Sequence, residues 1–238
     1  MMERIAEASP HLKARVAGVF EALEGFTSAF GQVFILGKLV VSGNAAATAA
    51  NILAHERLFW LGFASSILGV VFHIVWALLF YSLFKPVSKT LSLLAAFVAI
   101  VVCAVQAITG LLYVAPLLVL KGGSALSAFA PPQLQALAYL FLKLNNYAFE
   151  VDLVFFGLWC ILSGYLMFRS SFLPRVFGVL LAIDGLGWML YLYPPFAVSV
   201  FTFIAGASAL AEIPLQLWLI VMGVNSEKWK QQASAAGQ

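Results

Sequence analysis

The stretch of sequence that decides the fold is LFWLGFASSILGVVFHIVWALLFYSLF, residues 58–84. It contains no Lys, Arg, Asp or Glu, and its one ionisable imidazole is His73. About 20 consecutive, mostly apolar residues are enough to cross the hydrocarbon core of a bilayer as a helix. In lipid the backbone must satisfy its own hydrogen bonds, which a helix does within one segment. The stretch therefore predicts a transmembrane helix.

The composition of the whole chain indicates the same environment. The 238 residues are 63% hydrophobic and 10% charged, with a mean hydropathy of +1.00. Soluble domains are about 45–50% apolar and roughly 25% charged, so a water-soluble globule could not hide this much apolar surface. The net charge of +3 is modest and forms no basic cluster with interleaved aromatic residues, so nucleic-acid binding is not expected.

Other apolar stretches have the length and composition of membrane spans, and Pro, Gly and basic residues separate them. The expected spans are residues 16–41, 58–84, 91–120, 151–168, 173–193 and 198–224, with tails at residues 1–15 and 225–238. The terminators are Lys85-Pro86, Lys121-Gly122-Gly123, Pro131-Pro132, Pro174-Arg175 and Pro194-Pro195. The expected fold class is all-α: a polytopic transmembrane helical bundle of about six spans in one domain, residues 16–224.

Two segments between spans are not plain loops. Residues 44–55 are rich in helix-favouring residues, and we expect a helix on the outer surface. Residues 133–146 are amphipathic and run into the fourth span without a breaker. They are expected either to extend that span beyond the outer leaflet or to lie flat on the membrane.

The distribution of Lys and Arg predicts the orientation, because cytoplasmic loops carry an excess of both residues. Most of them flank the spans on one side, and fewer lie on the other. The first group is Arg4, Lys13, Arg15, Lys85, Lys89, Arg169, Arg175, Lys228 and Lys230; the second is Lys38, Arg57, Lys121 and Lys143. Both termini are therefore expected in the cytoplasm.

Several polar side chains fall inside the expected spans, where ionisable groups are expensive and need a reason. The candidates for binding a ligand or a proton are Glu24, His73, Gln106, Asp184, Glu212 and Gln216. No Lys or Arg lies at mid-depth to pair with Asp184 or Glu212, so these acids are expected to be neutral or to share a proton. The alternative is that the polar groups form interhelical hydrogen bonds that hold the helices in register.

A second polar cluster is expected near the outer surface. It consists of Asn145, Asn146, Glu150 and Asp152 at the start of the fourth span, with Lys38 at a similar depth on the first. One interpretation is a salt bridge from Lys38 to Glu150 or Asp152. The other is that these side chains line an outer vestibule.

The sequence lacks the patterns of several membrane chemistries. The sixth span has no Lys for a retinal Schiff base, and only His73 lies deep enough to bind haem or a metal. No Gly-x-Ser-x-Gly turn, Walker loop or GxGxxG motif is present. Cys103 and Cys160 form no CxxC pair and are expected to pack as small hydrophobic residues. We therefore expect no cofactor, no metal and no catalytic residue.

Several stretches resemble a bacterial membrane-protein family known as domain of unknown function 4386. They are GKLVVSGNAAATAANILA (37–54), LFKPV (83–87), LQAL (134–137), FFGLW (155–159) and SFLPRVFGVL (171–180), with Glu212, LWL (217–219) and GVN (223–225). The resemblance covers nearly the whole chain. It implies a single domain in the bacterial cytoplasmic (inner) membrane and supplies no catalytic residues.

Three functions remain as hypotheses. The first is a non-enzymatic membrane protein that binds another membrane protein, or a lipophilic or small polar ligand, within its bundle. The second is a small proton-linked transporter that uses Glu24, Asp184 and Glu212. The third is a membrane enzyme acting on a lipid-soluble substrate.

Overall fold

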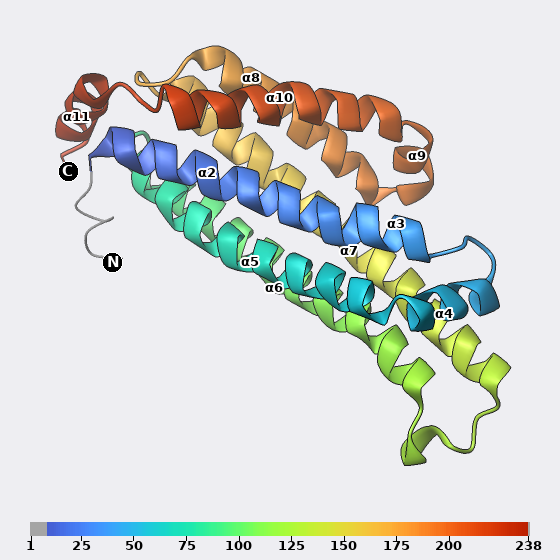
Figure 1. Ribbon diagram of the computed structural model, residues 1–238. Helices are drawn as coiled ribbons and strands as arrows, with labels where there is room; N and C mark the ends of the chain where they lie inside the picture. The colour runs from blue at the N-terminus through green and yellow to red at the C-terminus, as the bar shows by residue number, and fades with distance from the viewer. Residues whose placement is uncertain (1–8, 238) are drawn as a thin grey trace. The chain divides into compact units, whose positions relative to one another are not determined.

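The computed structural model describes residues 9–237, and every regular element in that range is helical (Figure 1). Six helices are long and apolar enough to cross a membrane: Pro10–Leu39, Glu56–Phe84, Lys89–Lys121, Pro131–Arg169, Arg175–Leu192 and Phe201–Val221. The expectation of an all-α protein with about six membrane spans is confirmed. Lipid is therefore the solvent for most of this chain.

The first span is built from three consecutive segments, α2 (Pro10–Ala29), a π-helical segment η1 (Phe30–Ile35) and α3 (Leu36–Leu39). The others are α5 (Glu56–Phe84), α6 (Lys89–Lys121), α7 (Pro131–Arg169), α8 (Arg175–Trp188) with the 3₁₀ turn η3 (Met189–Leu192), and α10 (Phe201–Val221). Shorter elements are α4 (Ala45–Ala54), the 3₁₀ turn η2 (Ser124–Leu126), α9 (Pro194–Ser199) and α11 (Ser226–Ala235).

The structure has helix within both expected tails. The expected tail 1–15 is helical from Pro10, because proline suits the first turn of a helix; residues 1–8 of that tail lie outside the described residues. The expected tail 225–238 contains α11, whose N-cap Asn225 accepts a hydrogen bond from the backbone of Lys228. Span-finding by hydropathy missed both because their residues are polar.

The helices α4 and α7 lie where the sequence favoured helix between spans. Asn44 caps α4 by accepting a hydrogen bond from the backbone N–H of Ala47. The 39-residue helix α7 runs without interruption through the expected extension and the expected span. At 1.5 Å per residue it is roughly 60 Å long, about twice the thickness of a bilayer's hydrocarbon core. Part of α7 must therefore lie outside the hydrocarbon region.

The packing divides the described residues into two compact units. Unit 1 contains the residues up to Leu23, Phe72–Cys103 and those from Val151 onward. Unit 2 contains Glu24–Val71 and Ala104–Glu150. The helices α2, α5, α6 and α7 each contribute residues to both units.

The core of unit 1 is aromatic. The rings of Trp76 and Trp159 meet edge to face at 4.4 Å between centroids, and Phe80 lies 5.1 Å from Trp159. Both Trp side chains are fully buried. Because each buried aromatic ring removes a large apolar area from the surroundings, this cluster anchors α5 against α7.

Glycines allow α7 and α8 to approach each other at backbone distance. A Cβ added at Gly185 would lie 2.5 Å from the carbonyl oxygen of Gly157, and one added at Gly178 would lie 2.5 Å from that of Gly164. The two contacts pair residues seven apart on each helix. Small residues at such contacts are how membrane helices gain close packing without a hydrophobic driving force.

Hydrogen bonds connect the helices at both ends of the described chain to other helices of unit 1. The guanidinium Nε of Arg15 on α2 donates to the carbonyl of Ile220 at the end of α10, at 2.8 Å. The indole of Trp229 on α11 donates to the carbonyl of Leu83 at the end of α5, also at 2.8 Å. The start of α2 and the ends of α5 and α10 therefore lie at the same end of unit 1, with α11 beside them (Figure 1).

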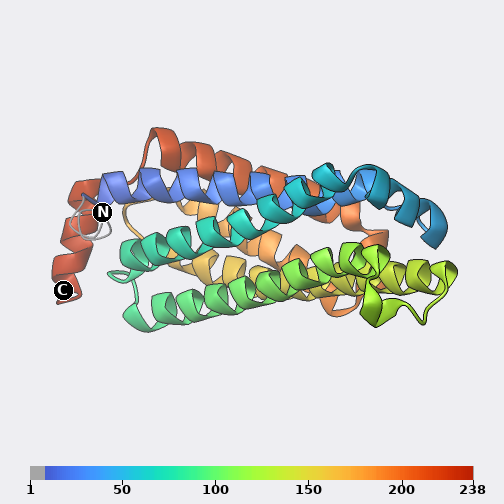
Figure 2. The same cartoon turned by 60° about the horizontal axis from the view of Figure 1, so that its bottom comes forward.

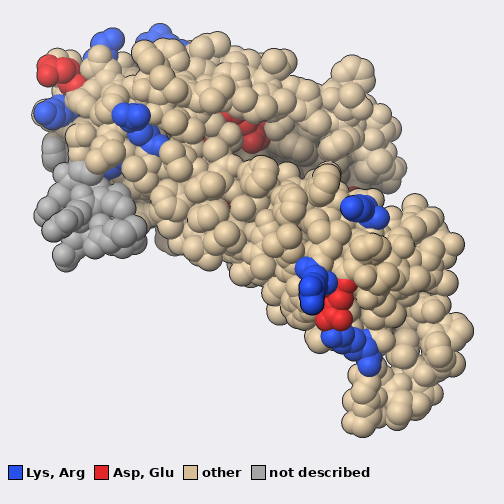
Figure 3. Space-filling model, in the orientation of Figure 1, with Lys and Arg blue, Asp and Glu red and all other residues tan. Residues whose placement is uncertain are grey.

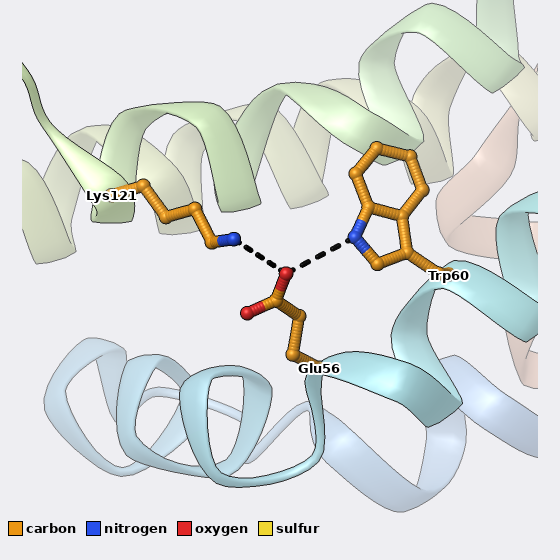
Figure 4. Close-up of polar contacts among 3 residues, drawn as sticks. All are labelled: Glu56, Trp60 and Lys121. Atoms are coloured by element: carbon orange, nitrogen blue, oxygen red, sulfur yellow. Dashed lines mark hydrogen bonds and ion pairs between the residues drawn. The ribbon is translucent and has the colours of Figure 1, made fainter.

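The helices α5 and α6 form an antiparallel hairpin that is visible in both ribbon views (Figures 1 and 2). At the open end of the hairpin, in unit 2, Lys121 at the end of α6 pairs with Glu56 at the start of α5. The same Glu56 oxygen accepts a hydrogen bond from the indole N–H of Trp60 at 3.2 Å (Figure 4). Both groups of the ion pair are solvent-accessible, as expected at the end of a membrane helix.

The surface is dominated by uncharged residues. On the face shown in Figure 3, few side chains are Lys, Arg, Asp or Glu. Large apolar side chains are exposed along several helices, for example Leu111, Phe203 and Leu210. A soluble monomer rarely exposes so much apolar area, so this surface is suited to contact with lipid.

Candidate functional site

Unit 2 contains a groove with a volume of about 550 Å³ between the end of the first span and α7. We call it the unit 2 groove. Its lining residues are Gln32, Val33, Leu36, Gly37, Val40, Ser42, Tyr139, Leu142, Lys143, Asn145, Asn146, Tyr147 and Phe149. Ligand pockets usually measure about 300–1,000 Å³ and combine an apolar lining with a few polar groups. This groove has both properties.

The π-helical segment η1 forms one wall of the groove. It carries Gln32 and Val33, which line the groove. Gly31 of the same segment packs closely against α5. A Cβ at Gly31 would lie 2.5 Å from the carbonyl oxygen of Gly62 on α5, so only glycine fits this approach. The hydroxyl of the buried Tyr113 donates to the carbonyl of Gly31 at 3.4 Å. Single π-helical turns inside α-helices occur frequently at functional sites.

The opposite wall of the groove comes from α7 and is polar. The hydroxyl of Tyr139 accepts a hydrogen bond from the backbone N–H of Gly43 at 2.7 Å, which fixes the loop after α3 against α7. The ammonium of Lys143 lies 5.4 Å from the centre of the Tyr139 ring, within the range of a cation–π interaction. The amide of Asn146 donates to Glu150 at 2.7 Å.

An apolar surface continues from the groove along the first span. Phe26, Phe30 and Phe34 stack in a row, with ring centroids 6.1 Å and 5.6 Å apart. Val33 belongs both to this surface and to the groove lining. A molecule in the groove could therefore extend an apolar part along the three rings.

Asn145 is the polar residue that fixes this part of α7 in place. Its side chain is 1% exposed, and its amide donates to the carbonyl of Thr109 on α6 at 2.8 Å. Interhelical hydrogen bonds in membrane proteins contribute about 0.6 kcal/mol on average and up to about 1.7 kcal/mol. The bond therefore makes a moderate contribution to the packing of α7 on α6.

Replacing Asn145 by Ala should lower the free energy of unfolding by about 1–2 kcal/mol, because a buried interhelical hydrogen bond is lost. Denaturation of the protein in mixed micelles, followed by circular dichroism, measures this change. The control is Leu144→Ala on the same helix, where the side chain is exposed and little loss is expected. Equal stability of the two variants would contradict the assigned role of Asn145.

Glu24 and Gln106 come together in unit 2. The carboxylate of Glu24 accepts hydrogen bonds from the hydroxyl of Ser28 at 3.1 Å and from the amide of Gln106 at 3.5 Å. Close by, the hydroxyl of Ser65 on α5 donates to the carbonyl of Thr27 at 2.9 Å. These bonds connect α2 with α5 and α6, which is the structural role that polar groups often have in membrane bundles.

Asp184 and Glu212 come together in unit 1. Asp184 on α8 is fully buried, and its carboxyl group lies beside the side chains of Glu212, Cys160, Ser208 and Trp188. Ser208 donates its hydroxyl hydrogen to Glu212 at 2.8 Å, one turn away on α10. His73 is also buried in unit 1, where its ring stacks on Trp76 with centroids 4.7 Å apart.

A family model described as a domain of unknown function (DUF4386) matches residues 16–223. The chain belongs to this family. The resemblance seen in the sequence is thereby confirmed. No curated protein and no solved structure matches the chain.

In this DUF4386 protein the six candidate residues for a ligand or proton are divided between the two units. Glu24 and Gln106 meet in unit 2, whereas His73, Asp184, Glu212 and Gln216 belong to unit 1. The side chain of Gln216, one turn beyond Glu212 on α10, makes no hydrogen bond within residues 9–237. Within unit 2 the structure joins Glu24 to Gln106, and within unit 1 it joins Asp184 to Glu212.

The outer-vestibule candidates are also divided. Asn145 and Asn146 line the unit 2 groove, and Glu150 binds Asn146 beside it. Lys38 is exposed and does not line the groove. The salt bridge from Lys38 to Glu150 or Asp152 stays a prediction; Glu150 is buried and accepts a hydrogen bond from Asn146. Asp152 lies in unit 1.

Sequence reasoning missed several groove residues in this DUF4386 chain. The missed residues lie in segments that the sequence indicated were a span end, a loop and a surface helix. They are Gly37, Ser42, Tyr139 and Lys143. Besides Asn145 and Asn146, Gln32 carried a signal, because it is a polar residue in an apolar helix. Within residues 9–237 no group of three or more His, Cys, Asp or Glu side chains is placed to hold a metal ion.

Proposed function

We propose that this membrane protein is a non-enzymatic binding protein for an anionic amphiphile, a molecule with a negatively charged head and an apolar chain. The observation that carries the proposal is the unit 2 groove of about 550 Å³, with its polar wall on α7 and its π-helical wall opposite. Its volume suits a small lipid-like molecule.

The charge of the groove favours an anionic head. Among the described residues that line it, Lys143 is the one charged side chain, and its ammonium is held over the Tyr139 ring. Amides of Gln32 and Asn146 and the hydroxyl of Ser42 add polar groups to the lining. A carboxylate or phosphate head could accept hydrogen bonds from these donors.

The position of the groove favours an apolar chain on the same molecule. It reaches from η1, inside the first span, to Ser42, which follows the last helical residue Leu39. A site at the end of a membrane helix lies where polar heads and apolar chains of lipids meet. The row of Phe26, Phe30 and Phe34 offers a path for the apolar chain.

Binding of a dansyl-labelled fatty acid to the purified protein, followed by fluorescence, tests the proposal. Lys143→Gln should weaken binding of the fatty acid roughly three- to tenfold, since one partly screened charge contact contributes about 1 kcal/mol. The uncharged dansyl-labelled fatty alcohol should bind both proteins equally.

The control for that experiment is Lys121→Gln, which removes another exposed Lys of unit 2 that lies outside the groove. It should leave the affinity for the fatty acid unchanged. Equal weakening in both variants, or no weakening in Lys143→Gln, would contradict an anionic head in the groove.

The proposal includes an orientation in the bacterial inner membrane with both termini in the cytoplasm. Its support is the excess of Lys and Arg on the side of the termini. The contact of Arg15 with Ile220 is consistent with it, because the start of the first span and the end of the last lie together in unit 1. The groove would then face the outer leaflet.

A further inference from the structure

The contact between α8 and α10 in unit 1 brings two acids together. A Cβ added at Gly187 on α8 would lie 3.4 Å from Cγ2 of Ile204 on α10, so these residues are at the same level. The two helices are joined by the short η3 and α9 and run in opposite directions. About one turn from this contact, Asp184 therefore faces Ser208. Glu212 lies one turn beyond Ser208, and both are side-chain neighbours of Asp184.

The two helices that carry the acids offer no basic side chain near them. Neither α8 after Arg175 nor α10 contains Lys or Arg. From the neighbouring helices, Cys160 of α7 faces Asp184, and Glu21 of α2 lies near enough to act on Cys160. The ring of Phe72 packs on the ring of Phe20, with centroids 5.7 Å apart. His73 follows Phe72 and Glu21 follows Phe20, so both residues belong to this part of unit 1. The titratable groups around the pair thus include a thiol and a further acid.

The two acids also lack an arrangement suited to two negative charges. Asp184 is 0% exposed, and its side-chain neighbours include the second acid Glu212 together with Cys160, Ser208 and Trp188. Adjacent carboxylates in a buried site cannot both ionise without strong repulsion. A single proton between them removes that repulsion and lets one carboxyl group donate a hydrogen bond to the other.

We propose that Asp184 and Glu212 form a proton-binding site that holds one shared proton at neutral pH. Ser208 is a positioning residue, since its hydroxyl donates to one oxygen of Glu212 and lies beside Asp184. The site belongs to unit 1 and is independent of the proposed ligand groove, whose lining residues all belong to unit 2. Carboxyl pairs of this kind within membrane spans are the groups through which membrane proteins take up and release protons.

Infrared spectroscopy of the protein in lipid nanodiscs at pH 7 tests the proposal, because a protonated carboxyl group has a carbonyl band that a carboxylate lacks. The double variant Asp184→Asn/Glu212→Gln should lose the intensity of one protonated carboxyl group relative to the wild type. Glu227→Gln, which removes an exposed acid on α11, should lose none. If the double variant loses no band intensity, both acids are ionised in the wild type. If it loses the intensity of two protonated carboxyl groups, both are protonated. Either result would overturn the proposal.

A milder variant tests the same site if the double variant does not fold, as judged by gel filtration and circular dichroism. Ser208→Ala keeps both acids and removes only the hydroxyl that donates to Glu212. It should shift the frequency of the protonated carboxyl band without changing its intensity. An unchanged band in folded Ser208→Ala would mean that the protonated group is elsewhere and would overturn the assignment to this pair.

Discussion

Substituting Gly185 by Leu is expected to destabilise the protein by about 3 kcal/mol or more, at the upper end of the range for overpacked sites. The first carbon of the new side chain would already lie 2.5 Å from the Gly157 carbonyl oxygen and 2.9 Å from Cβ of Cys160. Because the closest atom belongs to the backbone of α7, it cannot move aside as a flexible side chain could. The two helices must separate, and their second contact at Gly164 and Gly178 loosens with them.

Gly206→Leu is the matched control for that variant. Gly206 lies on α10, also in unit 1, and a Cβ there meets nothing within 4 Å. Thermal unfolding in detergent should show a midpoint lowered on the order of 10 °C for Gly185→Leu and nearly unchanged for Gly206→Leu. Similar midpoints for the two variants would contradict the close packing of α7 on α8.

Substituting Gly37 by Trp is expected to abolish binding of the dansyl-labelled fatty acid to the unit 2 groove. Gly37 lines the groove, and a Cβ at this position meets nothing within 4 Å. The indole ring can therefore occupy the groove without displacing protein atoms. The expected loss of affinity is on the order of a hundredfold, which corresponds to about 2.7 kcal/mol, while the stability of the fold is retained.

Gly25→Trp is the control for a large ring added to the same span. Gly25 lies on α2 in unit 2, has equally open space at its Cβ, and does not line the groove. Both variants replace glycine by the same residue in a helical segment, so changes in helix propensity and in membrane affinity are matched. Loss of binding in both, or in neither, would contradict the location of the ligand.

The membrane spans could be predicted from the sequence because hydropathy is a local property. Residues 58–84 are almost entirely apolar and lie within α5. A stretch of this length and composition is suited to the hydrocarbon core of a bilayer rather than to water. The ends of helices were predicted less well, since they depend on caps and breakers: Pro10 starts α2 and Asn225 caps α11, outside the apolar runs.

The candidate sites could be predicted only in part. Asp184 and Glu212 were both noticed, because acids in apolar helices are unusual, and a shared proton was one expectation for them. The sequence did not show that Glu24 meets Gln106. Which helix faces define a shared site depends on tertiary packing. The π-helical turn at Phe30–Ile35 has no distinctive local sequence; its position is fixed by the approach of Gly31 to α5.

The central claim is that an anionic amphiphile occupies the unit 2 groove, and photo-crosslinking tests it most directly. A fatty acid with a diazirine near its carboxylate would be irradiated with the protein in nanodiscs, and the labelled peptides identified by mass spectrometry. We expect the label to concentrate on the two stretches that line the groove, residues 32–42 and 139–149, and to disappear from them in Gly37→Trp but not in Gly25→Trp. A label spread evenly over the lipid-exposed helices, or unchanged in Gly37→Trp, would contradict the claim.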